Sequence, residues 1–215
     1  SQNKSKILLI QNKALELSMF LSLPATAALL VGSEQIISSL FGYGAFSNEA
    51  VINSSKALYY FALGLPAFAL IKIFSSFFFA NHDTKTPFYI SLFSVALNIL
   101  ISLYYFRYIG FIIIPIATTI SSWFNSIVLF IYLINRSLFR FNNTFTSKFL
   151  KIIFASISMG LFFKFLTSFF KNQLAYYYEY KILFLFLCVI LCVVFYFLIS
   201  ILIKAFNSKD LKLKY

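Results

Sequence analysis

Residues 64–87 read GLPAFALIKIFSSFFFANHDTKTP, a pattern that predicts two membrane-spanning helices joined by a polar turn. The stretch places Pro66 and Lys72 inside an otherwise apolar segment and begins the next apolar segment at Pro87. An ionisable side chain inside a membrane helix is energetically costly, so it is a functional candidate by default. Lys72 is therefore the first candidate site residue.

The composition of the whole chain supports a membrane environment. Of 215 residues, 61% are hydrophobic, 21% are aromatic and only 11% are charged, whereas soluble proteins carry roughly 25% charged residues. The net charge of +12 is concentrated in short clusters between apolar segments, which is typical of the cytoplasmic loops of membrane proteins. We therefore predict an all-α integral membrane protein in contact with membrane lipids and with no nucleic-acid partner.

Six apolar segments approach the length of about 20 residues that a helix needs to cross a bilayer. They cover residues 14–32, 57–80, 87–106, 110–134, 148–170 and 181–203. We predict six transmembrane helices, which places both termini on the same side. In the first segment, Glu16 either reaches the membrane interface or lines a cavity.

The distribution of cations predicts which side is cytoplasmic, because cytoplasmic loops carry the excess of lysine and arginine. One side collects twelve cations: Lys4, Lys6, Lys13, Lys85, Arg136, Arg140, Lys148, Lys151, Lys204, Lys209, Lys212 and Lys214. The other side has four: Lys56, Arg107, Lys171 and Lys181. We predict that both termini are cytoplasmic and that the turn at 81–86 is cytoplasmic.

The turn after the second segment has the composition of a helix start. Thr86 is a suitable N-cap and Pro87 a suitable first helical residue. His82 and Asp83 could form a proton relay, or they could be solvated or capping groups, and a lone histidine in a loop favours the second reading. The predicted cytoplasmic turn consists of Asp83, Thr84, Lys85, Thr86 and Pro87.

Small and hydroxylated residues recur at helical spacing in the second, third and fourth segments. Such stripes are either packing seams between helices or the lining of a hydrated path. Lys72 lies about two turns from the cytoplasmic end of its segment and could bind an anionic group such as phosphate. The candidate substrate-binding residues are Lys72, Ser75, Ser76, Asn98 and Asn125.

Pro66 predicts a kink in the second helix. Proline has no backbone N–H, so the carbonyl of Ala62 loses its helical donor, and the bend is expected between Gly64 and Pro66. Kinked helices near the middle of the membrane are common in transporters, where they serve alternating access.

Motifs for catalysis are absent from the sequence. There is no Walker loop, no HExxH, no nucleophile elbow and no pair of carboxylates. Cys188 and Cys192 share one helix face, and packing is favoured over redox or metal chemistry because no histidine or carboxylate lies nearby. We predict no metal, no cofactor and no enzymatic activity, and a role in transport or lipid handling.

Two segments resemble the lipid II flippase family, the MviN-type members of the multidrug/oligosaccharidyl-lipid/polysaccharide exporter superfamily. They are LFGYGAFS at 40–47 and ALYYFALGLPAFALIKIFSSFFFANHDTKTPFYISLFSVALNIL at 57–100. The shared motifs are a turn at 40–46, a kinked helix at 64–68 followed by Lys72, and a loop at 83–87. The resemblance covers residues 14–135, and the remaining part is similar only in hydropathy.

The resemblance implies a fourteen-helix exporter fold of which this chain supplies the last six helices. Residues 1–135 would be the second part of the C-terminal transport lobe, and residues 136–215 a linker and an appended transmembrane hairpin with a cytoplasmic tail. The N-terminal helices of the same protein would be partners of this part. The resemblance implies that these helices supply most of an arginine-rich central cavity. No arginine lies in any apolar segment here, so Lys72 is the one cavity cation that the resemblance carries over.

The resemblance also implies a function. The protein would move undecaprenyl-linked peptidoglycan precursor from the cytoplasmic to the periplasmic leaflet of the bacterial inner membrane by alternating access, for cell wall biogenesis and cell shape. The alternatives are a polysaccharide or drug exporter of the same superfamily, or a membrane scaffold that transports nothing.

Overall fold

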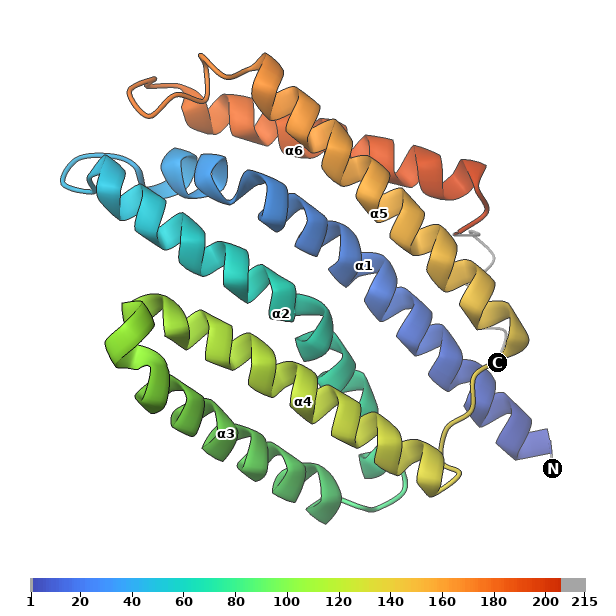
Figure 1. Ribbon diagram of the computed structural model, residues 1–215. Helices are drawn as coiled ribbons and strands as arrows, with labels where there is room; N and C mark the ends of the chain where they lie inside the picture. The colour runs from blue at the N-terminus through green and yellow to red at the C-terminus, as the bar shows by residue number, and fades with distance from the viewer. Residues whose placement is uncertain (1, 206–215) are drawn as a thin grey trace. The chain divides into compact units, whose positions relative to one another are not determined.

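Helices are the only regular secondary structure in the described part of the chain. The computed structural model describes residues 2–205, and the side chains of residues 2–5 and 143–144 are left aside. Within these residues lie α1 (Gln2–Phe41), α2 (Asn48–Ala80), α3 (Lys85–Ile109), the short 3₁₀-helix η1 (Gly110–Ile112), α4 (Ile113–Asn135), α5 (Asn143–Phe169) and α6 (Lys181–Leu202) (Figure 1). The predicted cytoplasmic tail, with Lys209, Lys212 and Lys214, lies outside the described residues, as does the side chain of Lys4.

Five stretches of helix within the described residues are long and apolar enough to cross a membrane. They are Lys6–Phe41, Asn48–Ala80, Lys85–Asn135, Phe145–Phe169 and Lys181–Leu202. The third stretch contains α3, η1 and α4 in succession. The prediction of an all-α membrane protein is therefore confirmed.

The first two helices are longer than the apolar segments that predict them. α2 begins at Asn48 although its apolar segment begins at residue 57, because backbone hydrogen bonds extend a helix into polar sequence that a hydropathy window excludes. In α1, Pro24 lies inside the helix, and the only residue with non-helical dihedral angles in this helix is Gly32.

The described residues form two compact units that do not follow chain order. Unit 1 consists of residues 2–22 and 63–149, and unit 2 consists of residues 23–62 and 150–205. α1, α2 and α5 each contribute to both units. The predicted boundary at residue 135 concerns a longer protein and stays a prediction.

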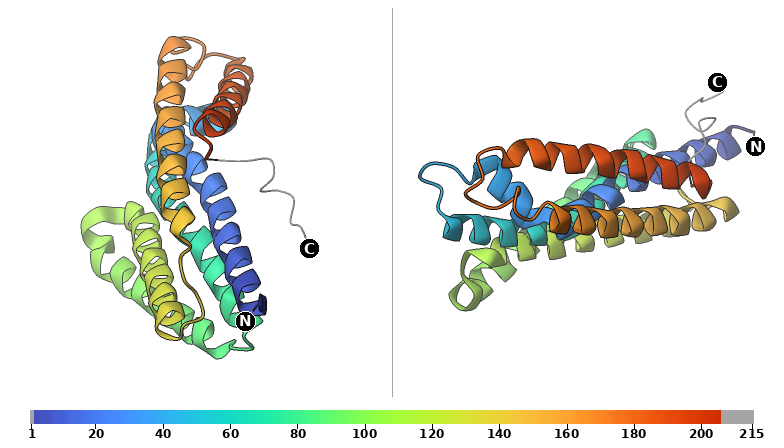
Figure 2. Two further views of the ribbon diagram at one scale, coloured as in Figure 1. Left: turned by 90° about the vertical axis from the view of Figure 1, so that its right-hand side faces the viewer. Right: turned by 90° about the horizontal axis from the view of Figure 1, so that it is seen from above.

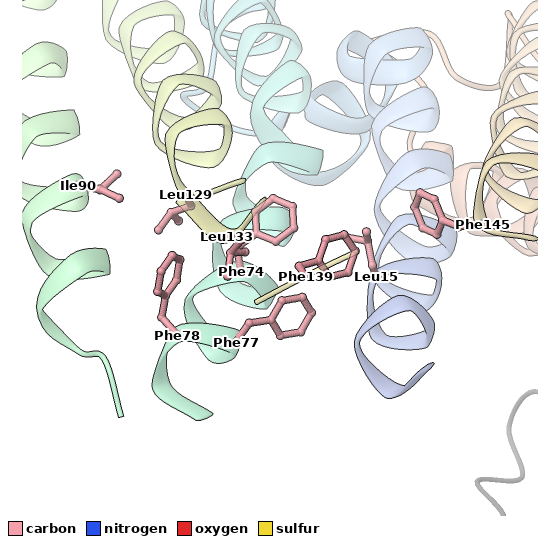
Figure 3. Close-up of a cluster of buried hydrophobic side chains, with 9 residues drawn as sticks. All are labelled: Leu15, Phe74, Phe77, Phe78, Ile90, Leu129, Leu133, Phe139 and Phe145. Carbon is pink, nitrogen blue, oxygen red and sulfur yellow. The ribbon is translucent and has the colours of Figure 1, made fainter. Parts of the chain in front are cut away.

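The core of unit 1 is a cluster of aromatic and aliphatic side chains on one side of α2. Phe74, Phe77 and Phe78 of α2 are at most 6% exposed, and Figure 3 shows them beside Leu129 and Leu133 of α4. The cluster also contains Leu15, Ile90, Phe139 and Phe145. Between membrane helices such contacts act through van der Waals packing rather than through removal of apolar surface from water, so close packing in this cluster holds α2 against α4.

The segment between α4 and α5, where the resemblance implies a linker, is packed against α1. Phe139 is only 1% exposed. The Asn12 side chain donates to the Arg140 carbonyl at 2.9 Å and accepts from the Asn142 N–H at 3.1 Å. This segment therefore belongs to the core of unit 1.

Glu16 forms an ion pair within unit 1. Its carboxylate accepts a hydrogen bond from Lys148 Nζ at 2.9 Å, and the two side chains are 15% and 28% exposed. The sequence suggested that Glu16 either reaches the membrane interface or lines a cavity. It did not predict this ion pair between α1 and α5.

Unit 2 packs α5 closely against α1 through two glycines. A Cβ on Gly32 would lie 2.2 Å from the ring of Phe163, and a Cβ on Gly160 would lie 3.3 Å from Ala27. α5 and α6 form a hairpin (Figure 2), in which Phe162 and Phe195 stack with ring centroids 4.3 Å apart. Small residues allow this close approach of membrane helices.

Lys181, the first residue of α6, is buried in unit 2. The residue is 1% exposed, and its Nζ donates to the carbonyls of Gly42 and Tyr176, both at 2.6 Å. The same nitrogen lies 4.3 Å and 4.7 Å from the ring centroids of Tyr43 and Tyr176. Two carbonyls and two rings thus surround the ammonium group and connect the α1–α2 loop to the α5–α6 loop.

Candidate functional site: a polar seam between α3 and α4

Two predicted polar stripes meet between α3 and α4 in unit 1. The chain reverses at Gly110, which has a φ of +70°, a conformation that glycine adopts without strain. α4 then runs back along α3 (Figure 1). The stripe containing Asn98 on α3 therefore faces the stripe containing Asn125 on α4.

Asn98 connects the two helices through its amide nitrogen. This nitrogen donates to Thr118 Oγ1 at 3.1 Å and to Ser121 Oγ at 3.2 Å. The hydroxyls of Thr118 and Ser121 in turn donate to backbone carbonyls of α4. The donors of this network are thus satisfied without water or ligand.

Asn125 is only partly satisfied. Its amide nitrogen donates to Ser91 Oγ at 3.3 Å, while its side-chain oxygen is buried and has no hydrogen-bond partner. A buried amide oxygen without a partner is destabilising by about 1–3 kcal/mol. Asn125 thus supplies a free acceptor at the seam.

A pocket of about 370 Å³ opens along this seam. Two apolar residues of α2, Phe68 and Ile71, form one wall, and the rest is Ser91, Ser94, Val95, Asn98, Thr118, Ser121, Ser122 and Asn125. No charged side chain lines it. The pocket can offer hydroxyl and amide groups to water or to a neutral polar group, but it cannot by itself neutralise a phosphate.

The candidate residues of α2 lie outside this pocket. Lys72 and Ser76 are exposed and Ser75 is half-buried, on the side of α2 opposite the buried Phe74 and Phe77. The hydroxyl of Ser76 donates to the Ile73 carbonyl of its own helix. The structure therefore brings Asn98 and Asn125 together and leaves Lys72, Ser75 and Ser76 apart from them.

The predicted kink region contacts α4. α2 is helical through Gly64 and Pro66, and a Cβ on Gly64 would lie 2.9 Å from Thr119 Oγ1. The indole N–H of Trp123 donates to the Leu63 carbonyl at 3.0 Å. A hydrogen bond from α4 thus reaches the α2 backbone one turn before the proline; a bend at Pro66 stays a prediction.

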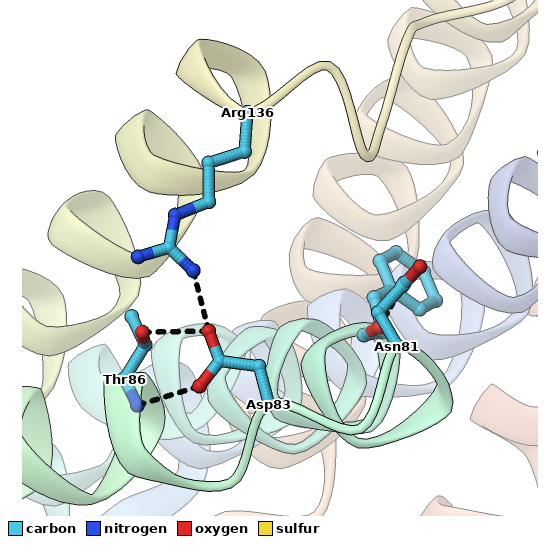
Figure 4. A network of polar contacts seen from close by, with 5 residues as sticks. Asn81, Asp83, Thr86 and Arg136 are labelled. Carbon is cyan, nitrogen blue, oxygen red and sulfur yellow. Dashed lines mark hydrogen bonds and ion pairs between the residues drawn. The ribbon is translucent and has the colours of Figure 1, made fainter.

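The turn between α2 and α3 is organised by Asp83 (Figure 4). Its carboxylate accepts from the Thr86 N–H at 3.0 Å and from the Thr86 hydroxyl at 2.7 Å, and it pairs with Arg136. The predicted helix start was wrong: Thr86 and Pro87 lie inside α3, which begins at Lys85 after Thr84. The carboxylate of Asp83 supplies the capping interaction that the sequence assigned to the Thr86 side chain.

These contacts lower the pKa of Asp83 below its usual 3.8. The largest cause is the hydrogen bond from the Thr86 N–H, followed by the Thr86 hydroxyl, with Arg136 adding to both; burial acts in the opposite direction. Of the two readings of this turn, the structure favours capping over a proton relay. His82 is exposed beside it and has a positive φ of 57°.

Metal-binding groups do not gather anywhere in the described residues, where no three histidine, cysteine or acidic side chains lie together. Cys188 and Cys192 are free thiols and are buried.

Sequence reasoning missed the environment of Lys181, because nothing in the pattern around it shows that its partners lie in the loop at 42–43.

Comparison with known protein families shows the family of the chain. The family described as lipid II flippase MurJ matches residues 1–187. The chain belongs to the MurJ family. This membership confirms the resemblance seen in the sequence, and it places the chain in a family of membrane transporters rather than of enzymes.

Relatives in the MurJ family match the chain over part of its length. A probable lipid II flippase MurJ from Rhizobium meliloti is 42% identical over 127 residues, which are 59% of this chain and 24% of that protein. The one from Rickettsia prowazekii is 40% identical over 57% of the chain and 24% of its own length. The one from Thermotoga maritima is 36% identical over 73% and 32%. The chain thus spans between a quarter and a third of these relatives.

A solved structure shares the fold. A lipid II flippase MurJ in an inward closed conformation matches with a TM-score of 0.75 and 24% identity, covering 94% of this chain and 40% of the solved one. The arrangement of helices described above is therefore that of part of a MurJ structure.

Proposed function

We propose that the chain is the C-terminal part of a flippase that moves undecaprenyl-linked peptidoglycan precursor, lipid II, from the cytoplasmic to the periplasmic leaflet by alternating access. The observation that carries the proposal is the family match over residues 1–187. In this proposal the fourteen-helix fold is completed by N-terminal helices, and the protein serves cell wall synthesis in the bacterial inner membrane.

Six crossings fit the helices of this chain. α3 has 25 residues and α4 has 23, and at about 1.5 Å per residue each exceeds the ~30 Å hydrocarbon core. Counting them separately turns five apolar stretches into six crossings. Six crossings put both ends of this segment on the same side, and we propose that this side is cytoplasmic because it carries the excess of lysine and arginine.

Labelling with a membrane-impermeant thiol reagent tests this orientation. Lys56 and Lys85 are both exposed, so Lys85→Cys and Lys56→Cys give matched reporters once Cys188 and Cys192 are replaced. Labelling of position 56 but not position 85 from the periplasm is expected. The reverse result would overturn the orientation.

Lys72 is the proposed contact for the anionic diphosphate of the substrate. Lys72 is exposed and directly follows Ile71, which lines the pocket along the seam between α3 and α4. A charge on this side of α2 could serve a cavity completed by other helices, while Asn98 and Asn125 supply neutral polar groups. The predicted bend at Gly64 and Pro66 would let α2 move during the cycle.

Growth complementation tests the role of Lys72. In the full-length protein, Lys72→Ala should impair growth support and Lys72→Arg should restore part of it, because the arginine keeps the charge. Lys164→Ala is the matched control, since Lys164 is also an exposed lysine within an apolar helix. Full complementation by Lys72→Ala at normal protein levels would remove this residue from the proposal.

A further inference from the structure

A second pocket, in unit 2, lies where the apolar helices end. It has a volume of about 210 Å³, below the range of about 300–1,000 Å³ that holds drug-sized ligands. Its polar lining residues are Glu34, Gln35, Ser38, Asn48, Thr167, Lys171 and Tyr176. This unit 2 pocket shares no lining residue with the pocket along the seam between α3 and α4.

The two charges of this pocket are not neutralised by each other. Glu34 and Lys171 both line the pocket and are exposed. Among the ion pairs of the described residues, neither of them takes part. One pocket therefore presents a free carboxylate and a free ammonium group.

Ser38 adds a buried polar atom to the pocket wall. The residue is 5% exposed, and its hydroxyl has no hydrogen-bond partner. A hydroxyl on a helix usually donates to the carbonyl one turn before it. Because Ser38 belongs to the pocket wall, a ligand in the pocket would give this hydroxyl an acceptor once its side chain turns toward it.

The position of the pocket is that of the membrane interface. α1 ends at Phe41, α2 begins at Asn48 and α5 ends at Phe169, so three apolar stretches terminate around it. Exposed tyrosines surround this end of unit 2, at positions 43, 177, 178 and 180. Tyrosine is enriched where membrane helices meet the headgroup layer.

We propose that this pocket binds the headgroup of a zwitterionic phospholipid with a primary ammonium group, phosphatidylethanolamine. The carboxylate of Glu34 receives the ammonium group, Lys171 receives the phosphate, and the Ser38 hydroxyl donates to a phosphate oxygen. A quaternary ammonium headgroup has no N–H to donate to the carboxylate. The acyl chains stay in the bilayer, since the pocket has room only for a headgroup.

Native mass spectrometry of the full chain in maltoside detergent tests the proposal. The protein is incubated with equal amounts of dioleoyl phosphatidylethanolamine, phosphatidylcholine and phosphatidylglycerol, and retained lipid is counted. Retention of phosphatidylethanolamine should exceed that of the other two by about tenfold, as expected for a hydrogen bond between charged groups. Equal retention of the three lipids would overturn the proposal.

Two variants assign the charges, and both change exposed side chains that take part in neither ion pair of the described residues. Glu34→Gln should remove the advantage of phosphatidylethanolamine over phosphatidylglycerol, because Lys171 still holds the phosphate. Lys171→Gln should lower retention of both lipids. Lys164→Gln, an exposed lysine away from the pocket, should change neither.

Unchanged lipid ratios in both pocket variants would overturn the assignment. Displacement of the bound lipid by O-phosphoethanolamine is also expected, since that molecule is the same headgroup without a lipid. Binding of O-phosphoethanolamine by a protein that retains none of the three lipids would overturn the lipid as occupant.

Discussion

The side-chain nitrogen of Lys181 lies 2.6 Å from the carbonyl oxygen of Gly42, although the two residues are 139 positions apart. A lysine with 1% exposure and two carbonyl partners is a structural element of unit 2. A buried ammonium group is tolerated only when its hydrogen bonds are made. Here backbone carbonyls and tyrosine rings take the place of a carboxylate.

Lys181→Met should therefore destabilise unit 2. The substitution keeps the length of the side chain but leaves the carbonyls of Gly42 and Tyr176 without a donor, at a cost of about 2 kcal/mol. Thermal unfolding of the chain in detergent, followed by circular dichroism, measures the effect. Lys164→Met, at an exposed position, should leave the unfolding temperature unchanged; an equal shift in both variants would contradict the role of Lys181.

The Asp83 turn should show a pH dependence. The pKa of Asp83 is lowered in the folded protein, chiefly by the hydrogen bond from the Thr86 N–H. A carboxyl with a depressed folded pKa contributes stability above its unfolded pKa and loses it as the pH falls through the folded value. The contribution should thus be complete at neutral pH and disappear below 3.8.

Comparison of the native chain with Asp83→Asn isolates this contribution. The unfolding temperatures of the two proteins should differ at pH 6 and converge as the pH falls below 3.8. Glu179→Gln, which replaces an exposed carboxylate in the α5–α6 loop, is the control. A difference that stays constant across the whole range would count against the lowered pKa.

Gly32→Ala should weaken the contact between α1 and α5. The new methyl group would lie 2.2 Å from the Phe163 ring, and overpacking of this kind costs about 1–3 kcal/mol. Adding Phe163→Ala should remove most of the penalty of the first substitution, which a double-mutant cycle in detergent measures. Gly160→Ala, with its nearest contact at 3.3 Å, should cost less.

The two asparagines of the polar seam should differ in their effect on stability. Asn98→Ala removes two hydrogen bonds to α4 and should lower stability by about 1 kcal/mol, in line with interhelical hydrogen bonds in membranes. Asn125→Ala removes one bond of 3.3 Å and also removes a buried oxygen without a partner. Its effect on unfolding in mixed micelles should be smaller, and an equal or larger loss would contradict this ranking.

Hydropathy and helical spacing were sufficient to predict the helices and the facing stripes. The apolar segments 148–170 and 181–203 match α5 and α6 closely, because a membrane helix must satisfy its backbone internally. The spacing of Asn98 and Asn125 likewise predicts that each faces a neighbouring helix. These features depend on local sequence alone.

Contacts between distant residues were not predictable in the same way. Nothing near Asn12 shows that it would hold the backbone of Arg140 and Asn142, and nothing near Lys181 points to Gly42. Residues 136–142 read as a linker because Arg136, Ser137, Arg140 and Asn142 interrupt the apolar residues Leu138, Phe139 and Phe141. The burial of Phe139 depends on the shape of a core that forms only when α1, α2 and α4 come together.

Trp123, whose indole N–H donates to the Leu63 carbonyl, is the only tryptophan in the chain. All tryptophan fluorescence of the chain therefore originates one helical turn from Pro66. Breaking that hydrogen bond would change the polarity around the indole and shift its emission wavelength. This chain thus carries its own optical reporter of movement in α2, which can be read in lipid vesicles without any added dye.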